Sequence, residues 1–169
     1  DETSGAYSGR LALGKKSSRT ASADSYFPVA EIVDVTDEIE NVELTQDLIL
    51  VPLKVGEAIL LNNITFETAS AVLKGDSFSD MDRVIDLLKA FPALKIEIAG
   101  HTDSSGGDAS NLRLSQARAE SVTEYILAHG ISPDRVVSKG HGESKPVATN
   151  LTPGGRAQNR RVEFVVLEL

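Results

Sequence analysis

The strongest constraint on the fold of this chain is the alternation, after residue 55, between two spacings of its apolar residues. Four short segments are rich in β-branched residues or alternate apolar with polar residues, which predicts buried strands at 59–66, 95–99, 136–139 and 161–167. Two longer segments between them repeat apolar residues three and four positions apart, as a helix with one buried face does. The predicted order is therefore β-α-β-α-β-β.

Capping residues mark the ends of the two predicted helices. Asp76 or Ser77 can cap the first helix. Asn111 is expected to cap the second helix, and Gly130 fits its C-terminal end. Residues 143–158 are rich in proline and glycine, and we expect them to form a long loop before the last strand.

Strands that are joined through helices form right-handed crossover units with parallel neighbours. We predict an α/β domain of the α+β type, a two-layer β-α-β-α-β-β sandwich with a mixed sheet and its helices on one face, spanning residues 55–169. Residues 1–54 are too few and too poor in apolar side chains to bury a core alone. We expect loose chain up to about Ser25 and β-rich pieces at 26–35 and 42–51, as in a linker or the tail of a preceding β domain.

Composition excludes several classes of function. The 17 Lys and Arg against 25 Asp and Glu give a net charge of −8, which argues against a general binder of nucleic-acid phosphates. No apolar run approaches the roughly 20 residues of a membrane helix, so we expect no membrane insertion by this segment. Cysteine is absent, which excludes disulfides, thiolate zinc sites and cysteine nucleophiles. Asp1 begins no signal-peptide pattern, so we expect a mature segment or a piece of a longer protein.

The densest polar cluster is Gly100-His101-Thr102-Asp103. It follows the second predicted strand, and ligands of open α/β sheets bind beyond such strand ends. Arg118 lies further along, in the second predicted helix. Asp103 close to Arg118 would present a carboxylate and a guanidinium together, which suits a zwitterion such as an amino-acid head group. From spacing alone, a structural ion pair between the strand end and the helix is the more common explanation.

Four short motifs follow one another in the C-terminal region: Gly100-His101-Thr102-Asp103; Asn111 with Leu114-Ser115 and Arg118-Ala119; Gly140-His141-Gly142-Glu143 with Pro146; and Gly155-Arg156 with Asn159-Arg160-Arg161-Val162-Glu163. With these motifs, residues 64–169 resemble the peptidoglycan-binding OmpA-like domain. That family includes the C-terminal domain of outer-membrane protein A, the peptidoglycan-associated lipoprotein and the periplasmic part of flagellar stator proteins. The motifs span essentially the whole α/β region in order, which makes the resemblance specific.

The resemblance implies a binding domain without enzymatic activity or cofactor. Its ligand would be peptidoglycan, held non-covalently through the diaminopimelate residue of the stem peptide, so that a larger periplasmic protein associated with the outer membrane is anchored to the cell wall. Asp103 and Arg118 match the pair that grips the amino and carboxylate ends of this residue. Other positions match residues that support or flank this pair: Thr102, Asn111, Leu114 and Arg160. A lysine-type stem lacks the distal carboxylate and would leave Arg118 without its anion.

One stretch departs from the family pattern. Where the family usually has Phe-Asp after the first strand, this chain has Phe66-Glu67, and Thr68-Ala69 replaces the phenylalanine and acid that often follow. Glu67 keeps a carboxylate that is one methylene longer. We include Glu67 and Thr68 among the candidate peptidoglycan-binding residues. The departure leaves an alternative open, namely a protein-interaction module of an envelope or secretion complex with a vestigial pocket.

Two chemical alternatives compete with simple binding. His101, Asp103, His141 and Glu143 could hold a metal ion if the two strand ends are adjacent, but their spacing matches no established ligand motif, and we expect no metal site. Ser115 could form a hydrolytic triad with His101 and Asp103, but it lacks the glycine-flanked context of a nucleophile elbow. We therefore expect no catalysis.

The N-terminal part has a resemblance of its own. Gly5-Ala6-Tyr7, Leu11 to Gly14, Ser25-Tyr26-Phe27 and Val35-Thr36 are similar to the end of a carboxypeptidase-regulatory-like β sandwich. This module precedes an OmpA-like domain in some large envelope lipoproteins of Bacteroidetes, including a component of the type IX secretion machine. The resemblance implies other envelope or secretion-complex proteins as further partners.

Overall fold

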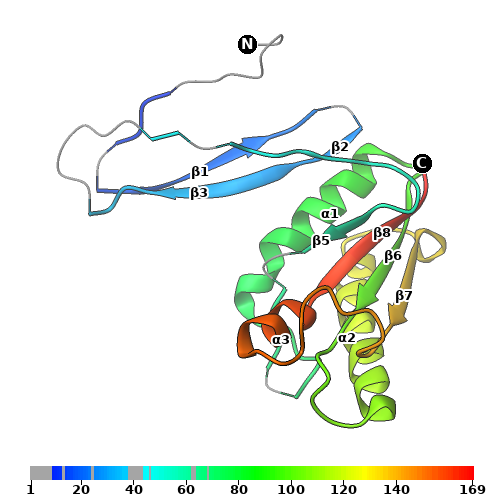
Figure 1. Ribbon diagram of the computed structural model, residues 1–169. Coiled ribbons are helices and arrows are strands. Elements are labelled where there is room, and N and C mark those ends of the chain that lie inside the picture. The colour runs from blue at the N-terminus through cyan, green and yellow to red at the C-terminus, as the bar shows by residue number, and fades with distance from the viewer. Residues whose placement is uncertain are drawn as a thin grey trace. The chain divides into compact units, whose positions relative to one another are not determined.

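The computed structural model describes residues 9–12, 14–23, 25–37, 44–45, 47–61, 64–67 and 69–169 (Figure 1). The chain forms two compact units, Asp1–Pro52 and Leu53–Leu169. Within the described ranges, no helix combines the length and the apolar character that crossing a membrane requires.

The described part of the N-terminal unit contains two small antiparallel sheets. In the first, β1 (Lys16–Ala21) pairs with β3 (Val29–Asp34), and in the second β2 (Tyr26–Phe27) pairs with β4 (Val51–Pro52). The expectation of loose chain up to Ser25 is wrong for β1. This strand consists mostly of polar residues without an apolar alternation, and its backbone pairing with the valine- and isoleucine-bearing strand β3 holds it in place.

The β-rich pieces predicted in this unit are confirmed at β2 and β3. Of the segment 42–51, residues 42, 43 and 46 lie outside the described residues, and the strand found there, β4, begins only at Val51. Residues 5–7, on which the N-terminal resemblance partly rests, also lie outside the described residues.

The C-terminal unit is built on one mixed sheet of four strands, in the order β5-β8-β6-β7. The strands are β5 (Ala58–Leu60), β6 (Lys95–Gly100), β7 (Val136–Gly140) and β8 (Val162–Glu168). β6 and β7 run parallel, whereas β8 is antiparallel to both β5 and β6. The predicted α/β fold with a mixed sheet is confirmed.

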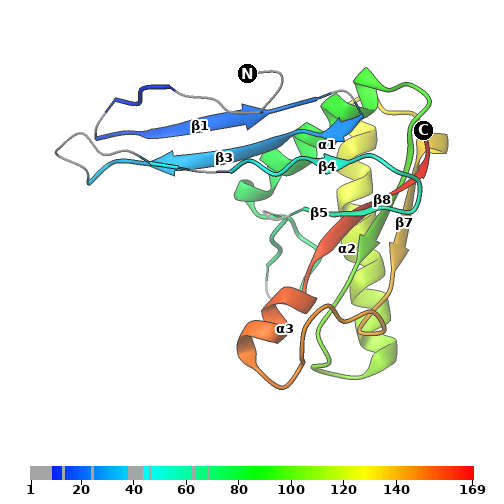
Figure 2. The same cartoon turned by 45° about the horizontal axis from the view of Figure 1, so that its top comes forward.

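Two long helices, α1 (Phe78–Ala90) and α2 (Asp108–Ala128), cover the same face of this sheet (Figures 1 and 2). Short 3-10 turns, η1 (Gly75–Ser77) and η2 (Pro133–Arg135), precede α1 and β7. Fully buried side chains from both layers meet between the helices and the sheet: Met81, Val84, Leu88, Ile96, Ile98, Val122, Ile126, Phe164 and Val166. Burial of these apolar surfaces holds the two layers together.

The long loop predicted between the last two strands is partly wrong, because Pro153–Asn159 form a short helix, α3. Proline is tolerated in the first turn of a helix, where its missing N–H is not needed. The hydroxyl of Thr152 accepts a hydrogen bond from the backbone N–H of Gly155 at 3.1 Å and so caps the helix. Gly155 also passes too close to the carbonyl of Thr149 for any side chain to fit.

Two further boundaries differ from the predictions. The first strand is limited to β5, and Phe66, predicted at its end, forms only an isolated bridge with Leu73. Helix α2 begins at Asp108 after Gly107, so Asn111 lies in its first turn and is not its cap. Ser77 is the N-terminal boundary residue of α1, but its hydroxyl donates to the carbonyl of Thr65 instead of capping the helix. The side chain of Asp76, the other predicted cap, lies outside the described structure.

Candidate functional site

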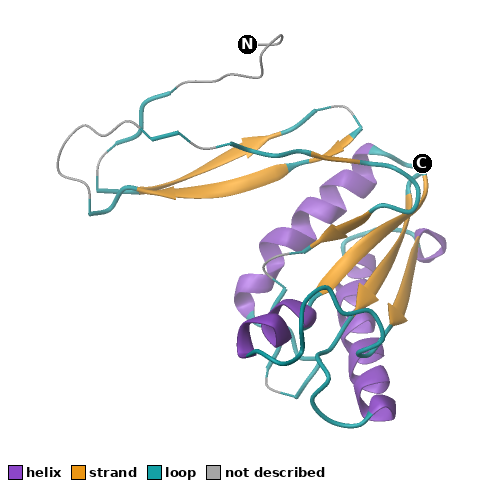
Figure 3. Cartoon of the chain, in the orientation of Figure 1, coloured by secondary structure: helices purple, strands orange, loops and turns teal. Residues whose placement is uncertain are grey.

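The site begins where two parallel strands end next to each other. β6 and β7 pair with Gly100 opposite Gly140, so the segments that follow, 101–103 and 141–143, leave the sheet side by side. A Cβ at Gly100 would lie 2.3 Å from the carbonyl oxygen of Ser115, and Gly140 is equally close to α2. The two glycines therefore let α2 pack directly against the strand ends. Figure 3 shows the start of α2 and helix α3 at this same end of the sheet.

Asp103 is buried at this end, and two donors hold its carboxylate. Nη1 of Arg160 donates to Oδ2 at 2.6 Å, and the backbone N–H of Ser105 donates to Oδ1 at 2.8 Å. Burial by itself raises the pKa of the Asp103 carboxyl, but these hydrogen bonds and the charge of Arg160 outweigh it and hold the pKa below its usual value. Asp103 is therefore ionised at neutral pH.

Arg118 reaches the site from α2 and is half-buried. Its Nε donates to the carbonyl oxygen of Ser70 at 3.0 Å, and its guanidinium carbon lies 4.9 Å from the centre of the Phe66 ring. Burial and the positive charge of Arg160 lower the pKa of Arg118, while the negative charge of Asp103 opposes them. In the described part of the chain no carboxylate forms an ion pair with Arg118, and the acid at the strand end pairs with Arg160.

Three predicted supporting residues lie around this pair in different environments. Asn111 is buried, and its Nδ2 donates to the backbone oxygen of Asp103 at 3.2 Å and to the carboxylate of Glu143. Thr102 is also buried, and its Oγ1 has no hydrogen-bond partner among the described residues. Leu114 is half-buried on α2. Asn111 therefore fixes the backbone of Asp103 by linking it to the segment after β7.

The departure from the family pattern falls on a tight turn beside Arg118. The backbone N–H of Ser70 donates to the carbonyl of Glu67 at 3.1 Å, and Ala69 adopts a positive φ of 52°. The side chain of Glu67 is exposed, and Thr68 lies outside the described residues. The turn presents the carbonyl of Ser70 to Arg118, so its contribution to the site comes through its backbone.

The four residues of the metal alternative do not converge. The rings of His101 and His141 stack with their centroids 5.1 Å apart. Nε2 of His101 lies 3.4 Å from a carboxylate oxygen of Glu163, and Nε2 of His141 lies 3.4 Å from a carboxylate oxygen of Glu97. The carboxylates of Asp103 and Glu143 face Arg160 and Asn111 instead. No group of three or more possible metal ligands gathers among the residues that the structure describes.

The hydroxyl of Ser115, the nucleophile of the hydrolytic alternative, is engaged by the backbone. It donates to the carbonyl of Leu112 at 2.9 Å and accepts from the N–H of Gly142 at 2.8 Å. Ser115 is fully buried and forms no hydrogen bond with His101. It therefore ties α2 to the segment after β7 and presents no nucleophile to a substrate.

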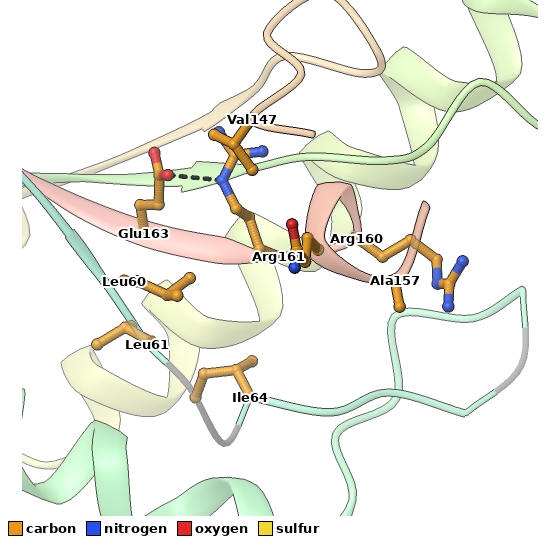
Figure 4. Close-up of a pocket in the computed structure, with 9 residues that line it drawn as sticks. Leu60, Leu61, Ile64, Val147, Ala157, Arg160, Arg161 and Glu163 are labelled. Atoms are coloured by element: carbon orange, nitrogen blue, oxygen red, sulfur yellow. Dashed lines mark hydrogen bonds and ion pairs between the residues drawn. The ribbon is translucent and has the colours of Figure 1, made fainter. Parts of the chain in front are cut away.

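A groove of about 510 Å³ lies beside α3, and Arg160 is among its lining residues (Figure 4). Leu60, Leu61, Ile64, Val147 and Ala157 give it apolar walls, and Gln158, Arg160, Arg161 and Glu163 complete the lining. Nε of Arg161 is paired with the Glu163 carboxylate at 2.6 Å, so these two charges neutralise each other. Arg160 belongs both to the groove and to the pair with Asp103.

Sequence reasoning missed several groups that shape the site. The N–H of Ser105 donates to the side chain of Asp103 two residues before it, which forms a tight turn. Aspartate often forms such turns, so the sequence could have indicated this one. The Phe66 ring against Arg118 and the Asn150 oxygen that accepts from the N–H of Ser104 at 3.2 Å join segments far apart in the chain. No local sequence signal marks these two contacts.

Comparison with known proteins places this chain in a family. The OmpA family matches residues 65–160, which is more than half of the chain. Outer membrane porin F of Pseudomonas fluorescens is 45% identical over 104 residues, 62% of this chain and 32% of that protein. The probable lipoprotein YiaD of Escherichia coli is 40% identical over 117 residues, 68% of this chain and 53% of that protein. The peptidoglycan-binding protein ArfA of Mycobacterium tuberculosis is 42% identical over 103 residues, 61% of this chain and 32% of that protein.

Solved structures share the fold. The cell wall anchor of the T6SS from Pseudomonas aeruginosa has a TM-score of 0.57 at 31% identity, with 66% of this chain and 80% of that chain covered. The peptidoglycan-associated lipoprotein from Burkholderia pseudomallei has a TM-score of 0.56 at 28% identity, with 69% and 93% covered. The chain spans between about a third and a half of the length of these three curated relatives, whose names describe a porin, a probable lipoprotein and a peptidoglycan-binding protein. With its motifs in order, its mixed sheet and this family match, the chain belongs to the OmpA family.

Proposed function

We propose that this domain binds peptidoglycan non-covalently, through the diaminopimelate residue of the stem peptide, and so anchors a larger envelope protein to the cell wall. The observation that carries the proposal is the half-buried guanidinium of Arg118. It has no carboxylate partner among the described residues although it lies beside the ionised Asp103. A partly desolvated cation without an anion favours a ligand that brings one.

The charges of the site match the free end of diaminopimelate. Asp103, Arg118 and Arg160 together carry one negative and two positive charges, so the site offers a counter-charge both to an ammonium and to a carboxylate. The ligand ammonium would donate hydrogen bonds to the free lone pairs of the Asp103 carboxylate. The ligand carboxylate would accept hydrogen bonds from the terminal N–H groups of Arg118. Arg160, which is half-exposed, can contact the same carboxylate while it stays near Asp103.

The remaining candidate residues would support this contact. Asn111 holds the backbone of Asp103, and the buried hydroxyl of Thr102 offers a further donor next to it. We propose Leu114 as an apolar contact for the ligand's methylene chain, and we keep Glu67 and Thr68 as candidate peptidoglycan-binding residues. For Glu67 the longer side chain would let the carboxylate turn into solvent when no ligand is bound.

The relatives support the proposal through what their names state. ArfA of Mycobacterium tuberculosis is a peptidoglycan-binding protein, and a structure of similar fold is the cell wall anchor of the T6SS from Pseudomonas aeruginosa. Because other relatives are an outer membrane porin and a lipoprotein, we place this domain in the periplasm, associated with the outer membrane through the full-length protein. Residues 1–54 would then be a linker or the tail of a preceding β domain, and residues 55–169 would be the wall-binding domain.

The test is calorimetric titration of the 169-residue chain with a stem peptide containing meso-diaminopimelate, beside its lysine analogue. We expect saturable binding of the first and at least about tenfold weaker binding of the second, because an unpaired guanidinium costs more than about 1.4 kcal/mol. Asp103→Ala and Arg118→Ala should each abolish binding while the circular dichroism spectrum and melting temperature show a folded chain. Equal affinity for both peptides, or unchanged binding by either folded variant, would contradict the proposal. Binding of neither peptide would favour a protein-docking module.

A further inference from the structure

Asn159, the last residue of α3, has a fully buried side chain whose hydrogen-bonding capacity is completely used. Its Oδ1 accepts from the backbone N–H groups of Val147 and Ala148, both at 2.9 Å. Its Nδ2 donates to the carbonyl of Ala148 and to Oδ1 of Asn150, again at 2.9 Å. Two donors and two acceptor positions are all that a carboxamide offers, and Asn159 uses every one of them on residues of the loop 147–150.

This loop is connected to Asp103. The same Oδ1 of Asn150 also accepts from the backbone N–H of Ser104 at 3.2 Å, and Ser104 directly follows Asp103. On its other side, Asn159 is followed by Arg160, which donates to the carboxylate of Asp103. Asn159 therefore approaches Asp103 by two routes, one through the loop and one through its own chain neighbour.

We propose that Asn159 is a positioning residue of the binding site: by clamping the loop 147–150 it makes Asn150 present an acceptor to Ser104, and this fixes the backbone that aims the carboxylate of Asp103. Asn159 itself touches no ligand in this arrangement, because its side chain is fully buried and all its partners are protein groups. The inference rests on the proposed function, in which Asp103 receives the ligand's ammonium.

The polarity of the amide is the part of this arrangement that can be tested. In Asn159→Asp, one oxygen still accepts from Val147 and Ala148, but the other faces the carbonyl of Ala148 and Oδ1 of Asn150. Two acceptors in contact repel each other. Asn150 can relieve its share of this repulsion by turning its amide, which directs its Nδ2 to residue 159 and removes the acceptor from the N–H of Ser104. The damage is thus expected at Asp103, several residues away from the substitution.

Asn150→Asp is the matched control. It adds the same negative charge to the same network and has nearly the same volume, but both hydrogen bonds of the Asn150 side chain are accepted by Oδ1. A carboxylate keeps both of them. The difference between the two variants isolates donor polarity from charge.

The experiment uses the 169-residue chain and its two variants, with the meso-diaminopimelate stem peptide as the probe. We expect Asn159→Asp to bind at least about tenfold more weakly than Asn150→Asp, as the loss of one oriented hydrogen bond in a site implies. Without any ligand, the Ser104 amide should exchange its hydrogen faster in Asn159→Asp, and the pKa of Asp103 measured by NMR should rise further than in the control. Equal affinities, or equal exchange and pKa in the two variants, would overturn the proposal.

A further variant covers the case in which Asn159→Asp does not fold. Asn150→Ala removes the acceptor of Ser104 at a half-exposed position and leaves Asn159 in place. It should weaken binding and speed exchange of the Ser104 amide, and wild-type behaviour in both would refute the positioning role. If the unaltered chain binds no stem peptide, the proposed function fails. The ligand-free exchange and pKa measurements still decide whether Asn159 positions Asp103.

Discussion

Arg160 donates a hydrogen bond of 2.6 Å to the carboxylate of Asp103, although 57 residues separate the two in the chain. Asp103 follows β6 and Arg160 precedes β8, and these two strands are the inner strands of the sheet. The hydrogen bond between the two residues joins the segment after β6 to the segment before β8 at the end of the sheet where the site lies. The ionised form of the buried Asp103 carboxylate is therefore stabilised by the half-exposed guanidinium of Arg160.

Arg160→Gln should destabilise the chain in a pH-dependent way. In the folded chain the pKa of Asp103 is held below its usual 3.8, so its ionised form stabilises the fold above that pH, and this stabilisation is lost as the pH falls through the lowered value. Because Arg160 is half-exposed, we expect a loss on the order of 1 kcal/mol in the free energy of unfolding at pH 7. Urea unfolding at pH 7 and near pH 2 measures it. A loss of equal size at both pH values would contradict the assignment.

Phe66→Leu should weaken ligand binding through Arg118. The ring faces the guanidinium at 4.9 Å, and removal of a cation–π contact costs about 0.5–1 kcal/mol, which is roughly a two- to fivefold loss of affinity. Phe66→Tyr keeps the ring face and serves as the control, with affinity close to that of the unaltered chain. Titration with the diaminopimelate peptide distinguishes them. Equal affinity of the leucine and tyrosine variants would show that the ring does not hold Arg118.

Gly140→Ala should destabilise the fold, because a Cβ there would lie 2.4 Å from the backbone nitrogen of Gln116. Separating α2 from the strand end to admit it costs about 1–3 kcal/mol or more. Gly154→Ala is the control, since the first turn of α3 leaves open space around this position and alanine is the better helix former. Thermal unfolding should show a clear decrease in Tm for the first and little change or an increase for the second. Similar decreases in both would argue against the close approach of α2.

Glu163→Gln tests the contribution of the Glu163 carboxylate, which lies next to Arg161 and His101. The ring nitrogen of His101 at 3.4 Å and the pairing with Arg161, opposed by burial, lower the pKa of Glu163 to about 2. Ionised Glu163 therefore stabilises the fold above about pH 4.5, and this contribution, on the order of 1–2 kcal/mol because solvent screens a partly exposed pair, is lost as the pH falls towards 2. The variant should thus be less stable than the unaltered chain at pH 7 and nearly equal to it at pH 2. Chemical denaturation at the two pH values checks this, and a constant difference would be inconsistent with the lowered pKa.

The sheet and the strand-end cluster were predictable because their signals are local. Alternating apolar residues mark β6, and the polar run that follows Gly100 carries Asp103. β1 and α3 were missed for the opposite reason. β1 consists mainly of polar residues and is a strand through its pairing with β3, and the Pro-Gly-Gly start of α3 has the composition of a loop.

The site itself could be predicted only in part. An aspartate and an arginine near each other indicated a site for opposite charges. The actual partner of Asp103 is Arg160, which the pairing of β8 with β6 brings to it, and no local sequence pattern shows that pairing. Asn111 shows the same limit, since asparagine suits both a helix cap and a buried bridge. Only the position of Gly107 before α2 decides between the two.

β8, the last strand in sequence, lies between β5 and β6 inside the sheet. A nascent chain therefore cannot complete this sheet until β8 has been synthesised, because the hydrogen bonds at the centre of the sheet join segments far apart in the chain. Arg160 arrives together with that strand. A chain without β8 thus leaves Asp103 without its arginine, so the domain completes its candidate binding site in the same step in which it becomes folded.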